Sequence, residues 1–220
     1  MIQNITFASI DQRSCRGFLA KSPTKRAVVV IQEWWGLNDN IRLACERLAS
    51  MGYTALAPDL YHGVLAKNAD EAREQMQKLD FSRAVEEIRA AALHLKKNEG
   101  ATSIAVLGFC MGGALTLLTA LRATEFQAAV CFYGIPPKSA GDLAGIRIPV
   151  QAHFATTDDW CTPESVETLE ADFSRGKVPS EVHRYGAQHA FANEKRPEVY
   201  DAEAAAQAWK RVFEFLSKTL

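Results

Sequence analysis

The stretch "SIAVLGFCMGGALTLLTALRA" at residues 103–123 decides the fold class. Its apolar beginning predicts a strand that ends at Leu107, and its end predicts a helix. Between them, Gly108 and Gly112 stand two positions before and after Cys110. A residue held at the centre of a sharp strand–turn–helix needs neighbours without side chains at those two positions. We therefore expect an α/β fold in which the Cys110 side chain projects from the end of a strand, and Gly113 allows close packing of the helix on its neighbouring strand.

The remaining chain alternates between strand and helix patterns. Residues 5–8 and 15–20 alternate as a β-hairpin or meander does. Continuous apolar runs, typical of strands that are buried on both faces, then follow at "AVVVIQE" (27–33), "YTALAP" (53–58), "SIAVLG" (103–108), "AAVCFYG" (128–134) and "VQAHFA" (150–155). Helical patterns fill the intervals. This order predicts a mostly parallel sheet flanked by helices.

Three helices carry clear signals in the sequence. Residues 41–52 form one, with Asn38 or Asn40 as its N-cap and Gly52 as its stop. Residues 81–97 form another, and the last helix is expected from about residue 197 to residue 218. Their apolar stripes predict core packing rather than a cofactor site.

Composition limits the possible partners. The 220 residues are 48% hydrophobic and 23% charged, which suits one domain spanning residues 1–220. The formal net charge is -1, with both signs mixed along the chain, so we expect neither nucleic acid nor a membrane as a partner. The five cysteines form no C-x-x-C pair, and the first 18 residues contain no apolar signal segment. We therefore expect a cytoplasmic protein, as a monomer or a small homo-oligomer.

Cys110 has two interpretations. It is either a nucleophile, because the first turn of the following helix stabilises a thiolate or an oxyanion, or one more small buried side chain. A base is available in His189, which follows the strand-like "EVHRY" in the loop "YGAQHAFAN". An orienting acid is available in Asp158 or Asp159, after the strand at 150–155. The competing role for that loop is a helix N-cap, which suits Asp159 or Thr162 better than Asp158.

The order of cysteine, aspartate and histidine, each after a strand, is that of α/β-hydrolases with cysteine in place of serine. With this order in place, nearly the whole chain resembles the dienelactone hydrolase family. The matching segments are "VVVIQEWWGLNDNIR", "GYTALAPDLYHG", "DEAREQ", "VLGFCMGGAL", "HFATTDD" and "GAQHAFAN". The resemblance implies a compact α/β-hydrolase fold, with helices on both faces of the sheet and no large cap domain.

The resemblance also implies the catalytic roles. Cys110, His189 and Asp158 would form the triad, with Asp158 preferred over Asp159 because "HFATTD" matches the family up to its acid. Glu33 would contact the resting thiol and keep it protonated, because a nearby carboxylate disfavours the thiolate. The backbone N–H groups of Met111 and Trp34 would form the oxyanion hole.

Substrate contacts follow the family less closely. Arg73 in "DEAREQ" matches an arginine that binds a substrate carboxylate, although it also suits an ion pair with Asp70 or Glu74 on a helix surface. The family's second arginine corresponds to Asn193, with Arg196 three residues further on, and Gln77 stands in place of a tyrosine. Trp35, beside Trp34, indicates an enclosed site and is expected to contact the substrate.

The sequence thus predicts a hydrolase that cleaves a small ester or lactone through a thioester intermediate, without a metal or an organic cofactor. A broad carboxylesterase acting on other small esters is the first alternative. A glutamine-amidotransferase-like or stress-protein fold also places a cysteine in such a sharp strand–turn–helix, or elbow. In those folds the acid usually follows the histidine or is placed differently, whereas here the acid precedes His189, and this order disfavours them. A non-catalytic binding protein that keeps the fold is the remaining alternative.

Overall fold

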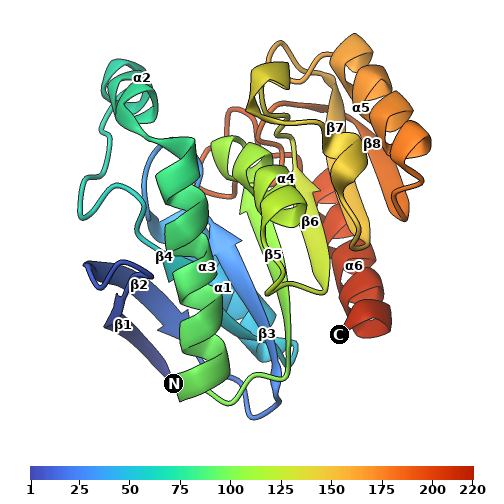
Figure 1. The fold of residues 1–220 in the computed structure, drawn as a ribbon. Helices are drawn as coiled ribbons and strands as arrows, with labels where there is room; N and C mark the ends of the chain where they lie inside the picture. Colours follow the sequence, from blue (N-terminus) through green and yellow to red (C-terminus); the bar gives the residue numbers. More distant parts are fainter.

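A computed structural model describes all residues, 1–220, and contains one eight-stranded sheet (Figure 1). The strands are β1 (Ile2–Ala8), β2 (Ser14–Ala20), β3 (Arg26–Ile31), β4 (Thr54–Pro58), β5 (Ser103–Phe109), β6 (Ala128–Phe132), β7 (Val150–Thr157) and β8 (Ser180–Gln188). Every apolar run singled out in the sequence forms a strand. The sheet order is β1-β2-β4-β3-β5-β6-β7-β8.

Strand direction divides the sheet into two parts. β1, β2 and β4 pair antiparallel in that order, as the predicted hairpin requires. From β4 through β3, β5, β6 and β7 to β8, every neighbouring pair is parallel. The carboxyl ends of these six strands therefore lie along one edge of the sheet, where α/β proteins place their ligands.

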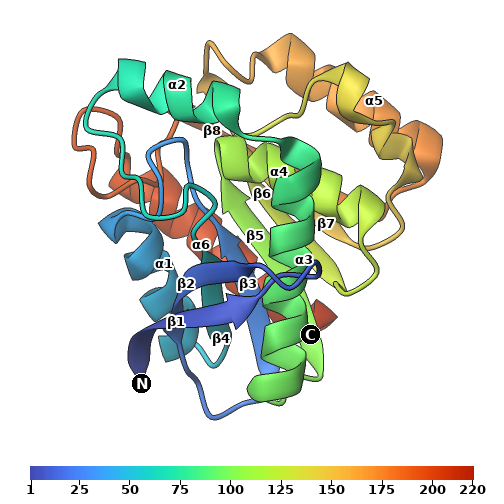
Figure 2. The ribbon, with the colours of Figure 1, turned by 60° about the vertical axis from the view of Figure 1, so that its left-hand side comes forward.

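Six α-helices and two short 3₁₀ helices connect the strands. They are α1 (Asp39–Ser50), α2 (Ala69–Lys78), α3 (Phe81–Asn98), α4 (Met111–Arg122), α5 (Pro163–Gly176), α6 (Ala202–Thr219), η1 (Lys138–Ala140) and η2 (Leu143–Gly145). α1 and α6 cover one face of the sheet, and α3, α4 and α5 cover the other (Figure 2). Each face has its own core of buried apolar side chains. The predicted α/β-hydrolase architecture is confirmed, and no cap domain covers it.

The helix N-termini follow the capping rules, but the predicted start of the last helix is wrong. Asn38, rather than Asn40, caps α1 by accepting hydrogen bonds from two backbone N–H groups, and Thr162 caps α5. The last helix begins at Ala202 instead of about residue 197. The backbone N–H groups of Val199 and Tyr200 bond back to Arg196 in a separate turn, and Asp201 then caps α6.

α2 stands apart from the two layers. It follows a long connection after β4 and projects beyond the carboxyl edge of the sheet (Figure 1). Only Ala72 of its residues is buried. None of the helices combines the length and apolar character that a membrane span needs.

Candidate active site

Cys110 lies in the turn between β5 and α4, and β5 ends at Phe109, two residues beyond the strand end expected from the sequence. Its backbone has φ +56° and ψ -119°, a conformation that costs energy for any residue with a Cβ atom. A Cβ atom on Gly108 would lie 2.2 Å from the carbonyl oxygen of Gly112, and one on Gly112 would lie 2.5 Å from that of Ile31. Only glycine fits these close approaches, as the G-x-C-x-G pattern predicted.

The side chains of three strand ends meet at this turn. His189 Nε2 lies 3.2 Å from Cys110 Sγ, and His189 Nδ1 lies 2.8 Å from Asp158 Oδ2. The other oxygen of Asp158 accepts hydrogen bonds from the backbone N–H groups of Trp160 and Cys161. Asp158, not Asp159, is therefore the carboxylate that contacts His189, while Thr162 performs the capping role.

The contacts among Cys110, His189 and Asp158 shift the pKa values of His189 and Asp158. Burial disfavours a charged His189, but its hydrogen bonds to Asp158 and Cys110 outweigh that cost and raise its pKa to about 10. Burial also opposes ionisation of Asp158, but hydrogen bonds from His189 and from the backbone lower the pKa of its carboxyl group. The surroundings thus favour a negative Asp158 beside an imidazole with high proton affinity.

Glu33 follows β3 and is only 1% exposed. Burial raises the pKa of its carboxyl group to about 7. Its Oε2 accepts a hydrogen bond from Asn193 Nδ2, while Oε1 and the hydroxyl of Tyr133 have no hydrogen-bond partner. The contact expected between Glu33 and the Cys110 thiol is not a hydrogen bond, and the thiol lies within hydrogen-bond distance of His189 Nε2. Glu33 and Cys110 nevertheless line the same cavity.

The expectation that Asn193 contacts the substrate is corrected by its position. It is 1% exposed and does not line the cavity. Its amide nitrogen holds Glu33, and its Oδ1 accepts a hydrogen bond from the backbone of Lys195. Asn193 therefore positions a residue of the cavity wall and does not face the substrate space.

Two residues of the cavity lining, Met111 and Trp34, have backbone N–H groups without a hydrogen-bond partner in the protein. Met111 is the first residue of α4, so its N–H has no partner within the helix. The N–H of Trp34 donates to no group of the protein. Both residues line the cavity beside Cys110, and the N-terminus of α4 adds its positive dipole end.

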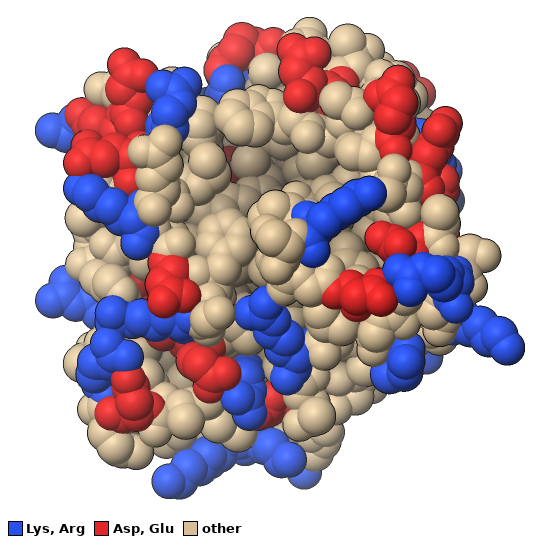
Figure 3. All heavy atoms as spheres, turned by 45° about the horizontal axis from the view of Figure 1, so that its top comes forward, with Lys and Arg blue, Asp and Glu red and all other residues tan.

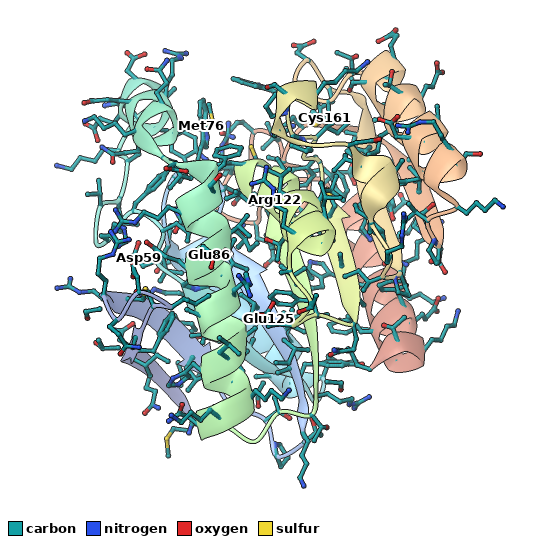
Figure 4. All side chains as sticks on the ribbon, viewed as in Figure 1. Asp59, Met76, Glu86, Arg122, Glu125 and Cys161 are labelled. Atoms are coloured by element: carbon teal, nitrogen blue, oxygen red, sulfur yellow. The ribbon has the colours of Figure 1, made fainter.

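A cavity of about 590 Å³ opens at the carboxyl edge of the sheet. Of its 22 lining residues, 13 are hydrophobic. Mostly uncharged residues surround the hollow in the surface, and most of the charged side chains on this face lie further out (Figure 3). Met76 of α2 and Cys161 of the loop after β7 line it and approach it from opposite sides of the upper end of the molecule (Figure 4). A cavity of this size and lining suits a small organic ligand.

The predicted substrate contacts divide into two groups. Trp35 lines the cavity as expected, and so does Gln77. Arg73 does not: its guanidinium pairs with Asp70 at 2.8 Å on the outer surface of α2, and its side chain is 51% exposed. The helix-surface alternative describes Arg73 better than the anion site. The cavity instead contains Arg196, whose guanidinium lies over the Trp35 ring at 5.4 Å.

Sequence reasoning missed two aromatic residues of the site. Tyr133 follows β6, is fully buried, and packs against the His189 ring at 5.1 Å. Trp160 follows Asp158 and lines the cavity although it is 60% exposed. The available signal was position, because both residues follow a strand at the edge where His189 was expected. No group of three or more His, Cys, Asp or Glu side chains is arranged to hold a metal ion.

The sheet topology, the elbow and the chain order of these side chains define the class as that of α/β-hydrolases. Comparison with known proteins gives the family. The model of the dienelactone hydrolase family matches residues 15–220, so the chain belongs to this family and is a carboxylic ester or lactone hydrolase.

Several relatives and structures are similar over most of their length. A "Putative carboxymethylenebutenolidase" of Aquifex aeolicus is 32% identical over 216 residues, which cover 93% of this chain and 94% of the relative. "Protein usf" of Aquifex pyrophilus is 35% identical over 203 residues, or 88% of each chain. The crystal structure of P91, a dienelactone hydrolase-like promiscuous phosphotriesterase from metagenomic libraries, is 27% identical. It superimposes with a TM-score of 0.86 over 99% of this chain and 98% of that one.

Proposed function

We propose that the chain, working as one domain of residues 1–220, hydrolyses a small carboxylic ester or lactone by covalent catalysis with Cys110 as the nucleophile. The observation that carries the proposal is the continuous line of contacts from Asp158 through His189 to Cys110, which ends on a strained elbow inside a ligand-sized cavity. A nucleophile, a base and an orienting acid in hydrogen-bond contact are what acyl transfer requires.

In the first half of the reaction, His189 Nε2 takes the thiol proton and Cys110 Sγ bonds to the substrate carbonyl carbon. The carbonyl π-electron pair moves to oxygen, and the Met111 and Trp34 N–H groups stabilise the resulting oxyanion. When the carbonyl re-forms, the C–O bond to the leaving group breaks. His189 donates its proton to the leaving oxygen, which leaves a thioester on Cys110.

In the second half, His189 accepts a proton from a water molecule, and the water oxygen bonds to the thioester carbon. The C–S bond then breaks, the acid departs and the proton returns to sulfur. Asp158 holds the imidazole in the productive tautomer throughout. Atoms and protons balance without a metal ion or organic cofactor.

A thiol nucleophile restricts the leaving group. Thiolate is itself a good leaving group, so a tetrahedral intermediate that carries a poor alkoxide or amine collapses back to the substrate. With esters of acidic alcohols and with strained lactones, the intermediate instead collapses forward to the thioester. Peptide bonds are therefore poor substrates for this site.

Arg196 gives the site a candidate contact for a substrate carboxylate. It is the cation that lines the cavity, and it is held between Glu198, at 2.8 Å from its Nε, and the ring of Trp35. We assign to Arg196 the anion recognition that the family resemblance implies for Arg73.

The test compares the wild-type protein with Cys110→Ala and His189→Ala on activated acetate esters and lactones. Turnover by wild type and its loss in both variants are expected, and mass spectrometry of a rapidly quenched reaction should find the acyl group on Cys110. A folded wild-type protein that turns over none of these substrates would instead support a binding protein with a hydrolase fold. The panel includes an aryl phosphotriester, because P91 is described as a promiscuous phosphotriesterase.

A further inference from the structure

The position of the leaving group follows from the acid that serves it. If His189 protonates the leaving oxygen, as in the proposed function on which this inference rests, the leaving group must lie beside the His189 ring. Two rings of the cavity wall lie next to that histidine: Tyr133 at 5.1 Å and Trp160 at 6.4 Å between centroids. Tyr133 is fully buried, whereas Trp160 is 60% exposed and lines the cavity.

Trp160 is held in place although its side chain is exposed. Its backbone N–H donates to Asp158 Oδ1 at 2.8 Å, which ties its position to the acid that orients His189. Its indole ring packs against Trp34 at 5.6 Å with an interplanar angle of 68°. A fixed indole ring at a cavity mouth provides a large apolar contact at a low cost in conformational entropy.

The three indole rings form one continuous surface, which we call the aromatic wall: Trp35, Trp34 and Trp160. Trp34 lies between the other two and contacts Trp35 at 5.2 Å, also edge to face. Trp34 also supplies the backbone N–H proposed for the oxyanion hole. The aromatic wall thus runs from the carbonyl-binding position to the histidine that serves the leaving group.

We infer that the aromatic wall is a leaving-group subsite for a planar aromatic alcohol, so that the substrate class is aryl esters. An aromatic ring placed against Trp160 would cover its exposed face with the edge or offset contacts that aromatic pairs prefer. The same ring makes the leaving oxygen a stabilised phenolate, which meets the demand of a thiol nucleophile. In the balanced step, the C–O bond breaks, its electron pair stays on the phenolic oxygen, and His189 supplies the proton.

The test separates aromaticity from leaving-group acidity. Phenyl acetate and hexafluoroisopropyl acetate have the same acyl group and leaving groups of comparable acidity, but only phenyl acetate has a ring. The readout is the ratio of kcat/KM for phenyl acetate to that for hexafluoroisopropyl acetate. The variants are Trp160→Ala, Trp160→Phe, and Leu93→Ala, which removes an exposed apolar side chain on α3 outside the cavity.

We expect Trp160→Ala to lower this ratio by about tenfold relative to wild type, whereas Trp160→Phe keeps most of it and Leu93→Ala keeps it entirely. Equal ratios in wild type and a folded Trp160→Ala would overturn the subsite. If Cys110 is required for hydrolysis of both esters but the ratio is the same in wild type and Trp160→Ala, the subsite is wrong and the proposed function stands. If neither ester is hydrolysed, the proposed function itself fails, and the subsite fails with it.

Discussion

His189 Nδ1 lies 2.8 Å from Asp158 Oδ2, although the two residues are 31 positions apart in the sequence. The second oxygen of Asp158 is occupied by the N–H groups of Trp160 and Cys161, at 2.8 and 2.9 Å. The carboxylate is therefore fixed from both sides and cannot rotate away from the imidazole. A fixed carboxylate keeps the proton of neutral His189 on Nδ1, which leaves Nε2 free to accept the thiol proton of Cys110.

The first prediction follows from this contact. Asp158→Asn would present an amide N–H to Nδ1 and favour the tautomer that carries its proton on Nε2, which cannot accept the thiol proton. We expect kcat for an activated ester to fall by about four orders of magnitude. Circular dichroism checks that the fold is kept. Asp159→Asn is the matched control, with a far smaller effect, and equal losses in the two variants would contradict the assignment of the acid.

Much of this site was accessible from sequence because its core depends on local rules. The elbow requires Gly108 and Gly112 through close backbone approaches. His189 and the pair Asp158 and Asp159 follow strands whose parallel order places their ends together, and the family resemblance favours Asp158 within that pair. These constraints appear in the residue pattern itself. The same reasoning found every strand.

The remainder depends on tertiary packing. Arg73 and Gln77 are one turn apart on α2, but only Gln77 reaches the cavity, because the helix projects outward from the sheet. Arg196 faces the cavity because its loop folds over Trp35, a contact between residues 161 positions apart by number. No local pattern encodes such contacts. The cytoplasmic location and the oligomeric state stay predictions of the sequence.

The second prediction concerns pH and stability. Glu33 has a pKa of about 7 in the folded protein against 4.5 ordinarily, so the folded state binds more protons than the unfolded state between these pH values. The free energy of unfolding should therefore decrease as pH rises from 4.5 to 7, by about 3 kcal/mol at most. Urea unfolding of Glu33→Gln should lack this part of the slope. Glu214→Gln, on the exposed side of α6, should keep it, and parallel curves for wild type and Glu33→Gln would refute the prediction.

The third prediction concerns the reactivity of the thiol. Ionised Glu33 in the same cavity disfavours the Cys110 thiolate. Above about pH 7, where Glu33 is charged, Glu33→Gln should react with iodoacetamide about threefold faster than wild type. Below that pH the two rates should converge. Mass spectrometry identifies the alkylated cysteine, and a rate difference that does not depend on pH would argue against a charge effect.

The fourth prediction concerns the elbow. Gly108→Ala would place a Cβ atom 2.2 Å from the Gly112 carbonyl oxygen, so the turn that presents Cys110 must shift. We expect a loss of about 2–4 kcal/mol in the free energy of unfolding and a large loss of activity. Gly186→Ala on β8 is the control, because its Cβ atom would meet nothing within 4 Å. Comparable unfolding curves for the two variants would show that the elbow tolerates a side chain.

The last prediction separates the two candidate arginines. Arg196 lines the cavity, whereas Arg73 pairs with Asp70 outside it. On an ester that bears a free carboxylate, Arg196→Gln should lower kcat/KM by about tenfold or more, since a charge-assisted hydrogen bond contributes about 1.5–3 kcal/mol. On the matching methyl ester the loss should be small, and Arg73→Gln should change neither rate. Equal losses on both esters would mean that Arg196 supports the Trp35 ring rather than an anion, and a carboxylate-specific loss in Arg73→Gln would return the anion site to α2.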